Sequence, residues 1–328
     1  MGVSPSAGLV SAVELEQIPS EPNILPMRDP SSPFARRAET TPKGFSRRAF
    51  GLGVTALTAT HAIKARATEG TISFGLTPVF LTNDLELLTK LKSYLERSTG
   101  NAVQLVQRRT YEEITSLLLS GQLQAAWICG YPFVQYRDRL SLVAVPIWRG
   151  KPLYQSYLII PKDREATDFE QLKGDLHAFS DPNSNSGYLV TAALLARQRL
   201  RPEQFFRQTF FTYGHRNVVR AVAAGLAQSG SVDGYVWEVM SAIEPELTGK
   251  TKVLRKSELL GFPPIACTSA EKDRNAVLLI KQALLGVKND PDGQAVLNLL
   301  RLDGFSSEDD SLFDSIADEM TLVRSVPA

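Results

Sequence analysis

The chain has 328 residues, 43% of them hydrophobic, and a formal net charge of +1. This length suffices for one large or two medium domains, and the composition is typical of a folded globular protein. A charge so close to zero gives no indication of a nucleic-acid or membrane-surface partner. A small anion would therefore have to be held by local geometry and not by bulk charge.

The N-terminal part differs in character from the rest. Residues 1–45 are rich in Ser, Pro and Ala, show no periodicity and predict disorder. Arg47 and Arg48 then precede a mild apolar run, 49–63, which is too short to span a membrane. This order resembles a twin-arginine export signal, and an ordinary secretory signal peptide is the alternative.

A cleavage site follows the apolar run. Ala65-Arg66-Ala67 fits the small-x-small pattern, so the mature protein is expected to start near Thr68, in the periplasm. No cysteine stands at this site, which argues against a lipid anchor. Because the leader before the arginine pair is long, translation could begin at Met1 or at Met27.

The cysteine and histidine pattern predicts no cofactor. Cys129 and Cys267 both lie in apolar surroundings, so buried free thiols are expected, although an exported protein could pair them. The mature part keeps His177 and His215 without any zinc-type Cys–His spacing, so no metal is expected. The chain also lacks the glycine-rich motifs of nucleotide sites.

The mature chain alternates strand and helix patterns in two similar halves. In the first half, a capping box joins Thr110 and Glu113 at the start of a helix. Such regular alternation predicts a parallel α/β sheet. Strand patterns occur at 71–76, 103–106, 125–128, 142–148, 154–160, 177–179, 208–211, near 232 and at 251–254, and helix patterns begin near 85, 110, 187, 217 and 235. The helix pattern that begins near 187 runs to about 200, and the one that begins at 217 runs to 228.

The C-terminal part is expected to return to the first half. Gly261-Phe-Pro-Pro264 has the stiffness of a strand that crosses between two lobes, and helices at about 270–285 and 290–300 and a final amphipathic helix follow it. We therefore expect two α/β lobes, joined by a two-strand hinge, with a cleft between them. The predicted parts are a leader with its signal at 1–67, lobe 1 at 68–155 plus 260–328, and lobe 2 at 156–259.

The most informative stretch runs from Phe179 to Leu189. An apolar run ends there in small polar residues, and a helix pattern follows. Ser184, Asn185 and Ser186 stand where the N-cap and first turn belong. Free N–H groups and the positive end of the helix dipole make such a place suitable for an oxyanion. The alternative is that these residues only cap a buried helix.

Taken together, the motifs of the mature chain resemble those of a known family. They are Trp127–Val134, Tyr154-Gln-Ser156, Asp181–Leu189, Tyr213-Gly-His215 and Val232–Glu238. In this order they resemble the phosphate/phosphite/phosphonate-binding proteins of ABC importers, and the likeness covers nearly the whole mature chain. The resemblance implies a bilobed periplasmic binding protein fold of type II. It also implies a monomer that binds a small phosphorus oxyanion, delivers it to a membrane permease and catalyses no reaction.

The resemblance further implies a ligand site drawn from both lobes. Hydroxyl and amide donors at the helix start would hold the P–O oxygens, while tyrosine, histidine and aspartate side chains would line the cleft. The expected ligand-binding residues are Tyr131, Phe133, Tyr154, Ser156, Ser184, Asn185, Ser186, His215 and Asp233.

Two positions depart from the family pattern. Phe133 stands where the family usually has a tyrosine, so either Tyr131 supplies the missing hydroxyl or the site is more apolar on that side. The segment Tyr213-Gly-His215 stands where Gly-Ser-His is more common, which removes one hydroxyl donor. Both departures bear on which oxyanion fits.

Asp233 is the most specific element of this set. A carboxylate repels a bare dianion, so its presence favours a ligand that brings a P–OH proton or an ammonium group. Sulfate brings neither at neutral pH and is expected to be rejected. The alternatives are a surface or capping role for Asp233 and a capping role without ligand for His215.

Besides the transport component, two other functions stay open from the sequence. One is a ligand-sensing partner of a membrane receptor or of another exported enzyme. The other is an enzyme on the same fold, with His215 and Asp233 as an acid/base pair. No nucleophile with an adjacent base stands out, so no catalysis is expected.

Overall fold

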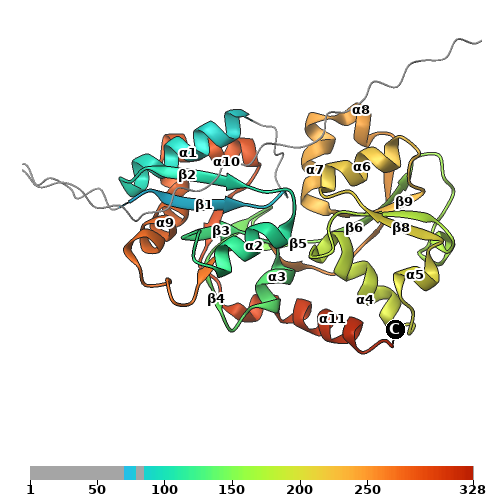
Figure 1. The fold of residues 1–328 in the computed structure, drawn as a ribbon. Coiled ribbons are helices and arrows are strands. Elements are labelled where there is room, and N and C mark those ends of the chain that lie inside the picture. The colour runs from blue at the N-terminus through green and yellow to red at the C-terminus, as the bar shows by residue number, and fades with distance from the viewer. Residues whose placement is uncertain (1–69, 79–84, 328) are drawn as a thin grey trace, which may run out of the picture. The chain divides into compact units, whose positions relative to one another are not determined.

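The computed structural model of the protein describes residues 70–78 and 85–327 (Figure 1). All of them belong to one compact unit, Lys64–Ala328. The predicted leader, arginine pair and cleavage site lie outside the described residues. None of the described helices is long and apolar enough to cross a membrane.

The first sheet consists of six strands, which are β1 (Ile72–Leu76), β2 (Val103–Gln107), β3 (Ala125–Trp127), β4 (Leu140–Ile147), β12 (Ile265–Thr268) and β13 (Gly304–Ser306). Their order is β13-β4-β12-β3-β1-β2. β1 pairs in parallel with β2 and β3, whereas β12 runs antiparallel to β3 and β4. In this sheet the expectation of parallel pairing is therefore right for β1 with β2 and β3, and wrong for the pairs that β12 and β13 make, which are antiparallel.

The direction of β12 follows from where the chain re-enters the sheet. Trp127 Nε1 donates to Pro263 O at 2.8 Å, and Ile128 N donates to Pro264 O at 2.9 Å. The returning chain thus meets β3 at its carboxyl end, opposite Trp127, and must run the other way. The sequence predicts no strand there, because a four-residue run behind two prolines carries little periodicity.

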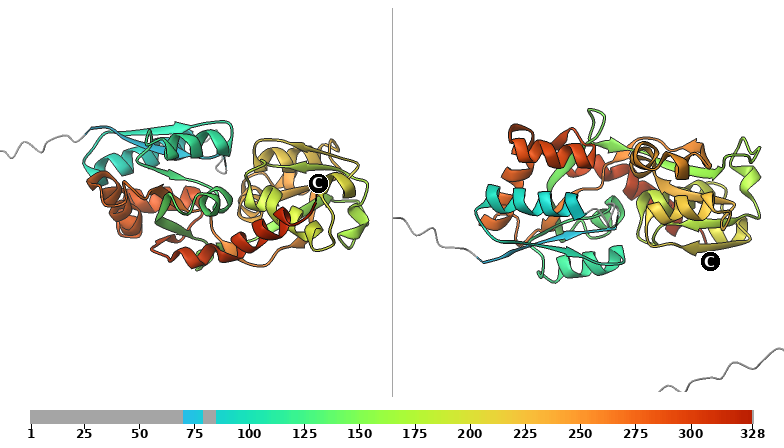
Figure 2. Two further views of the ribbon diagram at one scale, coloured as in Figure 1. Left: turned by 60° about the horizontal axis from the view of Figure 1, so that its bottom comes forward. Right: turned by 90° about the horizontal axis from the view of Figure 1, so that it is seen from above.

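Helices cover both faces of the first sheet. They are α1 (Leu85–Thr99), α2 (Tyr111–Leu119), α3 (Gly130–Gln135), α9 (Asn275–Gly286) and α10 (Pro291–Leu300). α1 and α2 lie on opposite sides of β1, as the view from above shows (Figure 2). The return of α9 and α10 to this half, where both pack against α1, agrees with the prediction.

The second sheet consists of five strands, which are β6 (Ser156–Pro161), β7 (Leu176–Phe179), β8 (Gln208–Phe211), β9 (Ser229–Asp233) and β10 (Thr251–Lys256). Their order is β10-β6-β9-β7-β8, with β7 parallel to β8 and β9 and with β6 antiparallel to β9 and β10. The helices of this half are α4 (Val190–Ala196), α5 (Pro202–Phe205), α6 (His215–Ala223), α7 (Gly234–Ile243) and α8 (Pro245–Thr248).

Two of these helices end earlier than their sequence pattern predicts. α4 ends at Ala196 instead of near residue 200, and Arg199 behind it has a left-handed φ of 57°. α6 ends at Ala223 instead of near residue 228, and Gly225 behind it has a left-handed φ of 72°. A left-handed residue stops a helix, which periodicity alone does not reveal.

A short antiparallel ribbon joins the two halves. It pairs β5 (Leu153–Tyr154) with β11 (Leu260–Gly261), so that Tyr154 lies opposite Leu260. The strand predicted at 154–160 is divided at Gln155, whose carbonyl accepts a hydrogen bond from Gly234 N at 2.9 Å. Two α/β lobes joined by two strands make the bilobed, type II-like architecture that the sequence predicts.

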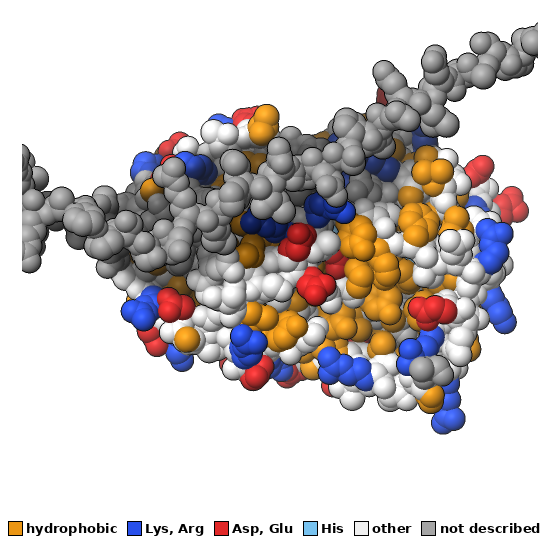
Figure 3. Space-filling view, in the orientation of Figure 1, with side chains coloured by type: hydrophobic (Ala, Val, Ile, Leu, Met, Phe, Trp, Pro, Cys, Tyr) orange, Lys and Arg blue, Asp and Glu red, His pale blue; other side chains and the backbone are white. Residues whose placement is uncertain are grey.

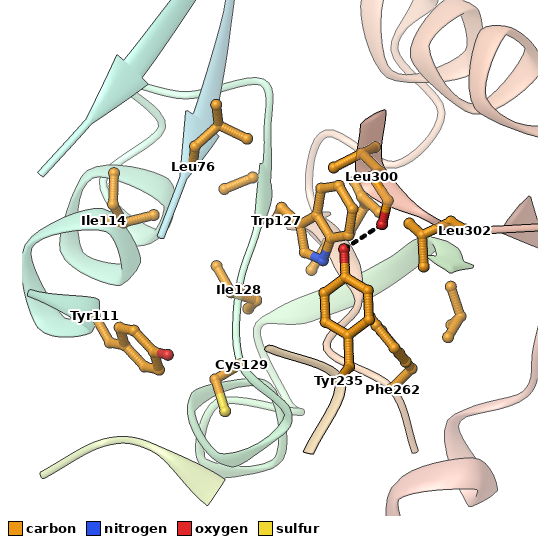
Figure 4. Packing of buried hydrophobic residues seen from close by; sticks show 14 of the residues in the cluster. Leu76, Tyr111, Ile114, Trp127, Ile128, Cys129, Tyr235, Phe262, Leu300 and Leu302 are labelled. Carbon is orange, nitrogen blue, oxygen red and sulfur yellow. Dashed lines mark hydrogen bonds between the residues drawn. The ribbon is translucent and has the colours of Figure 1, made fainter. Parts of the chain in front are cut away.

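Large aromatic side chains pack around this ribbon. The Phe262 ring lies 5.6 Å from the Tyr154 ring and 5.2 Å from the Tyr235 ring. Tyr235 of α7 donates its hydroxyl to Leu300 O at 2.5 Å, the hydrogen bond drawn in Figure 4. Elements of the second half are thereby held against α10 of the first.

The C-terminal helix α11 (Asp314–Arg324) contacts both halves. It packs against α3 and α4, and in Figure 1 it runs along the lower edge beneath them. Phe313, just before α11, lies with its ring 5.0 Å from that of Phe133 in α3. Arg201 holds the end of the chain by donating to Val326 O and Pro327 O, both at 2.8 Å.

The capping box at the start of α2 is present as predicted. Thr110 Oγ1 accepts from Glu113 N at 3.2 Å, and Glu113 Oε2 accepts from Thr110 N at 3.0 Å. Because these reciprocal bonds satisfy two free donors, they fix where α2 begins. They also place Tyr111 at its first position.

We predict that Thr110→Ala lowers the free energy of unfolding by about 1 kcal/mol, the usual cost of losing an N-cap. Thr89→Ala is the matched control, because Thr89 is exposed within α1 and its Oγ1 bonds only to Leu85 O of the same helix. The control should change stability by less than about 0.5 kcal/mol. Equal losses in urea unfolding of the two variants would contradict the capping role.

Candidate functional site

The stretch predicted to bind an oxyanion forms a buried helix start. Ser184 is the N-cap, and its Oγ accepts from Gly187 N at 3.0 Å. The first turn, Asn185–Leu189, is a π-helical turn that leads into α4. Ser184, Asn185 and Ser186 are all buried. The predicted N-cap is confirmed.

Hydrogen bonds hold this wide turn in place. Within it, Leu189 N donates to Ser184 O, five residues earlier, at 3.0 Å. From outside, Ser156 Oγ donates to Ser186 O at 2.6 Å, and Ser180 N donates to Gly187 O at 3.1 Å. Isolated π turns of this kind are frequent at functional sites.

Asn185 connects this turn to the first lobe and to the hinge. Its backbone N donates to Cys129 Sγ at 3.2 Å, and its Nδ2 donates to Tyr154 Oη at 3.1 Å. Among the described residues, the buried Asn185 Oδ1 and Ser180 Oγ have no hydrogen-bond partner. An unpaired buried polar atom costs about 1–3 kcal/mol, which makes both atoms candidates for contact with a ligand.

His215 is the first residue of α6 and is buried. Its Nδ1 accepts from Asp233 N at 3.0 Å, and its Nε2 lies 3.1 Å from Tyr111 Oη. Burial lowers the pKa of His215 to about 3, so the ring is neutral near pH 7. Because Nδ1 accepts, the proton of the neutral ring must be on Nε2, which donates to Tyr111.

This tautomer leaves the hydroxyl hydrogen of Tyr111 free to donate elsewhere. Tyr111 is buried, and its backbone N donates to Asp181 Oδ2 at 3.2 Å. Burial raises its pKa well above the usual value, so the hydroxyl keeps its proton. Figure 4 shows Tyr111 at the start of α2, with Cys129 on the neighbouring segment.

Asp233 ends β9 and caps α7. Its Oδ1 accepts from Val236 N at 3.2 Å, and in the sheet it lies opposite Ser156. The side chain is buried, which excludes the surface role, and burial raises its pKa to about 7. Near neutral pH this carboxyl can therefore either accept or donate a proton.

A close approach joins these parts into one cluster. A Cβ on Gly187 would lie 3.0 Å from His215 Cε1 and would collide with Ser180 Oγ, so the position requires glycine. Seven of the nine predicted site residues meet here, and Tyr111 joins them through His215. The polar cluster is Tyr111, Tyr154, Ser156, Ser184, Asn185, Ser186, His215 and Asp233.

The structure does not bring Tyr131 and Phe133 into the hydrogen bonds of this polar cluster. Phe133 is buried against Phe313, on the side of α3 that faces the C-terminal segment. Tyr131 is half-buried. Burial raises its pKa, and the positive charge of Arg324 in α11 offsets only part of this increase. Their predicted contact with a ligand stays a prediction.

The polar cluster offers neutral donors. The buried polar and charged side chains of the described residues include Asp181, Asp233 and His215 but no lysine or arginine. On the face seen in Figure 3, basic and acidic side chains are interspersed. An anion held here would rely on hydroxyl, amide and backbone donors, as the net charge of +1 led us to expect.

Both cysteines are free and buried. Cys129 accepts from the Asn185 backbone, and burial raises its pKa to about 12. Burial also raises the pKa of Cys267, to about 11. Within the described part of the chain, no group of three or more His, Cys, Asp or Glu side chains could hold a metal ion.

Tyr111, Cys129 and Ser180 were not predicted as parts of the site. Tyr111 carried a usable signal, since it comes four positions after the end of strand β2 and opens a helix. In open α/β sheets, ligands bind beyond the carboxyl ends of the strands. Its partner His215, however, is 104 residues away, and no local pattern connects them.

The chain forms two lobes that are joined by two strands, and the start of a helix in one lobe contacts the start of a helix in the other. This is the architecture of a periplasmic binding protein. The family described as "ABC transporter, phosphonate, periplasmic substrate-binding protein" matches residues 74–313. This match covers most of the chain, which therefore belongs to that family. Its members are substrate-binding components of transporters and act in the periplasm.

Solved structures share the fold. A binding protein component of an ABC phosphonate transporter from Pseudomonas aeruginosa has a TM-score of 0.70 at 21% identity, over 78% of this chain and 87% of that one. PhnD1 from Prochlorococcus marinus, in complex with methylphosphonate, has a TM-score of 0.70 at 15% identity, over 78% and 99%. A Xanthomonas citri protein bound to chloride ion has a TM-score of 0.63 at 15% identity, over 78% and 98%.

The raised pKa of Asp233 predicts how stability depends on pH. The folded protein holds this proton more tightly than the unfolded chain, so the stability that the protonated carboxyl contributes is lost as pH rises from the ordinary pKa of 3.8 to about 7. Asp233→Asn removes this titration and keeps a capping side chain. The free energy of unfolding of the variant minus that of the wild type should therefore be larger at about pH 8 than at about pH 5.

Urea unfolding of both proteins at the two pH values checks this prediction. Comparing the two proteins cancels the titration of every other group. A stability difference that stays constant between the two pH values, or that changes in the opposite direction, would contradict a buried Asp233 carboxyl with a raised pKa.

Proposed function

We propose that the protein binds one small phosphorus oxyanion, a phosphonate, phosphite or phosphate, at the polar cluster and delivers it to an ABC permease. The main support is the buried helix start at Ser184–Ser186, which lies against His215 through Gly187. Hydroxyl and amide donors there would hold the P–O oxygens. Hydrogen bonds to a charged group contribute roughly 1.5–3 kcal/mol each, so four or five offset the cost of desolvating the ligand.

Asp233 would select for a protonated ligand. Its carboxyl is buried with a pKa of about 7, and no buried lysine or arginine of the described residues offsets its charge. A ligand with a P–OH proton or an ammonium group satisfies the ionised carboxylate, whereas sulfate leaves two negative groups facing each other. Tyr111 would add a hydroxyl donor, because His215 Nε2 already donates to its oxygen.

Binding would close the two lobes around the ligand. Tyr111 of α2 and His215 of α6 stand in different lobes, and so do Cys129 and Asn185. We propose that lobe 1 comprises residues 68–155 and 260–328 and that lobe 2 comprises 156–259. The ligand would shift the protein toward the closed state because it bonds to both lobes at once. We further propose that the binding protein acts as a monomer.

Calorimetric titration with phosphate, phosphite, methylphosphonate, 2-aminoethylphosphonate and sulfate tests this proposal. We expect one-to-one binding of a phosphorus ligand and no binding of sulfate. Asp233→Asn should weaken binding of the protonated ligand by about tenfold or more, the equivalent of one charge-assisted hydrogen bond, and should relax the rejection of sulfate. No binding across the panel would refute the proposal, and unchanged selectivity in Asp233→Asn would refute the role of Asp233.

We also propose export by the twin-arginine route, with cleavage after Ala67. The arginine pair, the mild apolar run and the Ala65-Arg66-Ala67 site support it. Replacing both Arg47 and Arg48 by lysine should leave the precursor inside the cell, whereas wild-type protein from the periplasm should begin at Thr68. Unimpaired export of the double variant would favour an ordinary secretory signal.

A further inference from the structure

A cavity of about 670 Å³ is lined mainly by the two chain segments that contain Tyr111 and His215. One wall comes from the end of β2 and the start of α2, and the other from the segment that joins β8 to α6. In the first segment, the lining residues Arg109 and Glu113 stand before and after Tyr111 in the chain. In the second segment, the lining residues Tyr213 and Asn217 stand before and after His215. The segments that form the cavity are therefore the same two segments that the Tyr111–His215 hydrogen bond joins.

The cavity carries a surplus of positive charge. Arg108 and Arg109 both line it, and Glu113 is its acidic side chain. The Glu113 carboxylate is already engaged, because its Oε2 accepts from Thr110 N and Thr110 Oγ1, both at 3.0 Å. These hydrogen bonds lower the pKa of Glu113, with a smaller contribution from the charge of Arg108.

The two guanidinium groups have donors to spare. Arg108 Nη1 donates to Gln107 O at 2.8 Å. Neither Arg108 nor Arg109 takes part in an ion pair with another described residue. Both side chains are exposed, so a ligand can reach them. A guanidinium group matches a carboxylate or phosphate geometrically, because it can donate two parallel hydrogen bonds.

We propose that the ligand is a phosphonate whose carbon substituent carries a second acidic group, which Arg109 binds with support from the charge of Arg108. This inference rests on the proposed function, which places the phosphonate group on the polar cluster. Arg109 is two residues from Tyr111, so their Cα atoms are at most about 7 Å apart, and a ligand group that leaves the cluster beside Tyr111 would meet the Arg109 side chain. An ammonium substituent would instead face two positive charges. Asp233 would then accept the P–OH proton and not an amine.

Calorimetric titration of the full chain with three ligands tests the inference. The ligands are methylphosphonate, 3-phosphonopropionate and 2-aminoethylphosphonate, which share the phosphonate and differ in the charge of the substituent. We expect 3-phosphonopropionate to bind about tenfold more tightly than methylphosphonate, as one charge-assisted pair allows, and 2-aminoethylphosphonate to bind no more tightly than methylphosphonate. Added salt should reduce the tenfold ratio, since the arginines are exposed.

Arginine variants show where this preference originates. Arg109→Gln should bring the ratio of the two affinities close to one, and Arg108→Gln should lower it by a smaller factor. Arg207→Gln is the matched control: Arg207 is also exposed, but it lies just before β8, at the end of that strand remote from the cavity. The control should keep the full ratio.

The outcomes separate the two proposals. If none of the three phosphonates binds, the proposed function fails and this inference fails with it. If methylphosphonate binds but 3-phosphonopropionate binds no more tightly, or if 2-aminoethylphosphonate binds best, the inference alone is overturned. It is also overturned if the preference for 3-phosphonopropionate survives in both Arg108→Gln and Arg109→Gln, or is lost equally in Arg207→Gln.

Discussion

The hydrogen bond from Asp233 N to His215 Nδ1 is the constraint on which the polar cluster depends. It fixes the neutral tautomer of a buried histidine, so that Nε2 donates to Tyr111 across the two lobes. It also holds the start of α7 beside the start of α6, and Asp233 therefore caps one helix while its backbone orients the first residue of another. Because burial keeps His215 neutral, this arrangement adds donors without adding positive charge.

Local chemistry could be predicted from the sequence, and long-range pairing could not. The Ser184 cap and the Thr110–Glu113 capping box were predictable, because each involves residues three positions apart. The hydrogen bond that ties the π turn to β6 was not, since its donor, Ser156, lies 30 residues before Ser186 in the chain. The motifs that resemble the family supplied most of the polar cluster, but Tyr111 stood outside them and entered only through its contact with His215.

The electrostatics of the polar cluster explain how an almost neutral protein could select among oxyanions. The buried part of the described chain holds carboxyl groups and neutral donors but no lysine or arginine. Selection among anions would therefore depend on the combined charge of ligand and carboxyl groups, and not on attraction to a buried basic side chain. Positive charge instead lies outside the polar cluster, on Arg108 and Arg109 of the adjoining cavity. We propose that buried donors recognise the phosphonate group, while the exposed arginines recognise the substituent attached to it.

A crystal structure of the protein with methylphosphonate would show whether the polar cluster is the ligand site. We expect the phosphonate oxygens to lie within hydrogen-bond distance of the Ser184–Ser186 turn and of the Tyr111 hydroxyl. We also expect Asp233 to lie against one of these oxygens, with His215 Nδ1 still accepting from Asp233 N. Methylphosphonate bound elsewhere, with the polar cluster unchanged, would contradict this site, because the buried donors would then serve only to hold the lobes together.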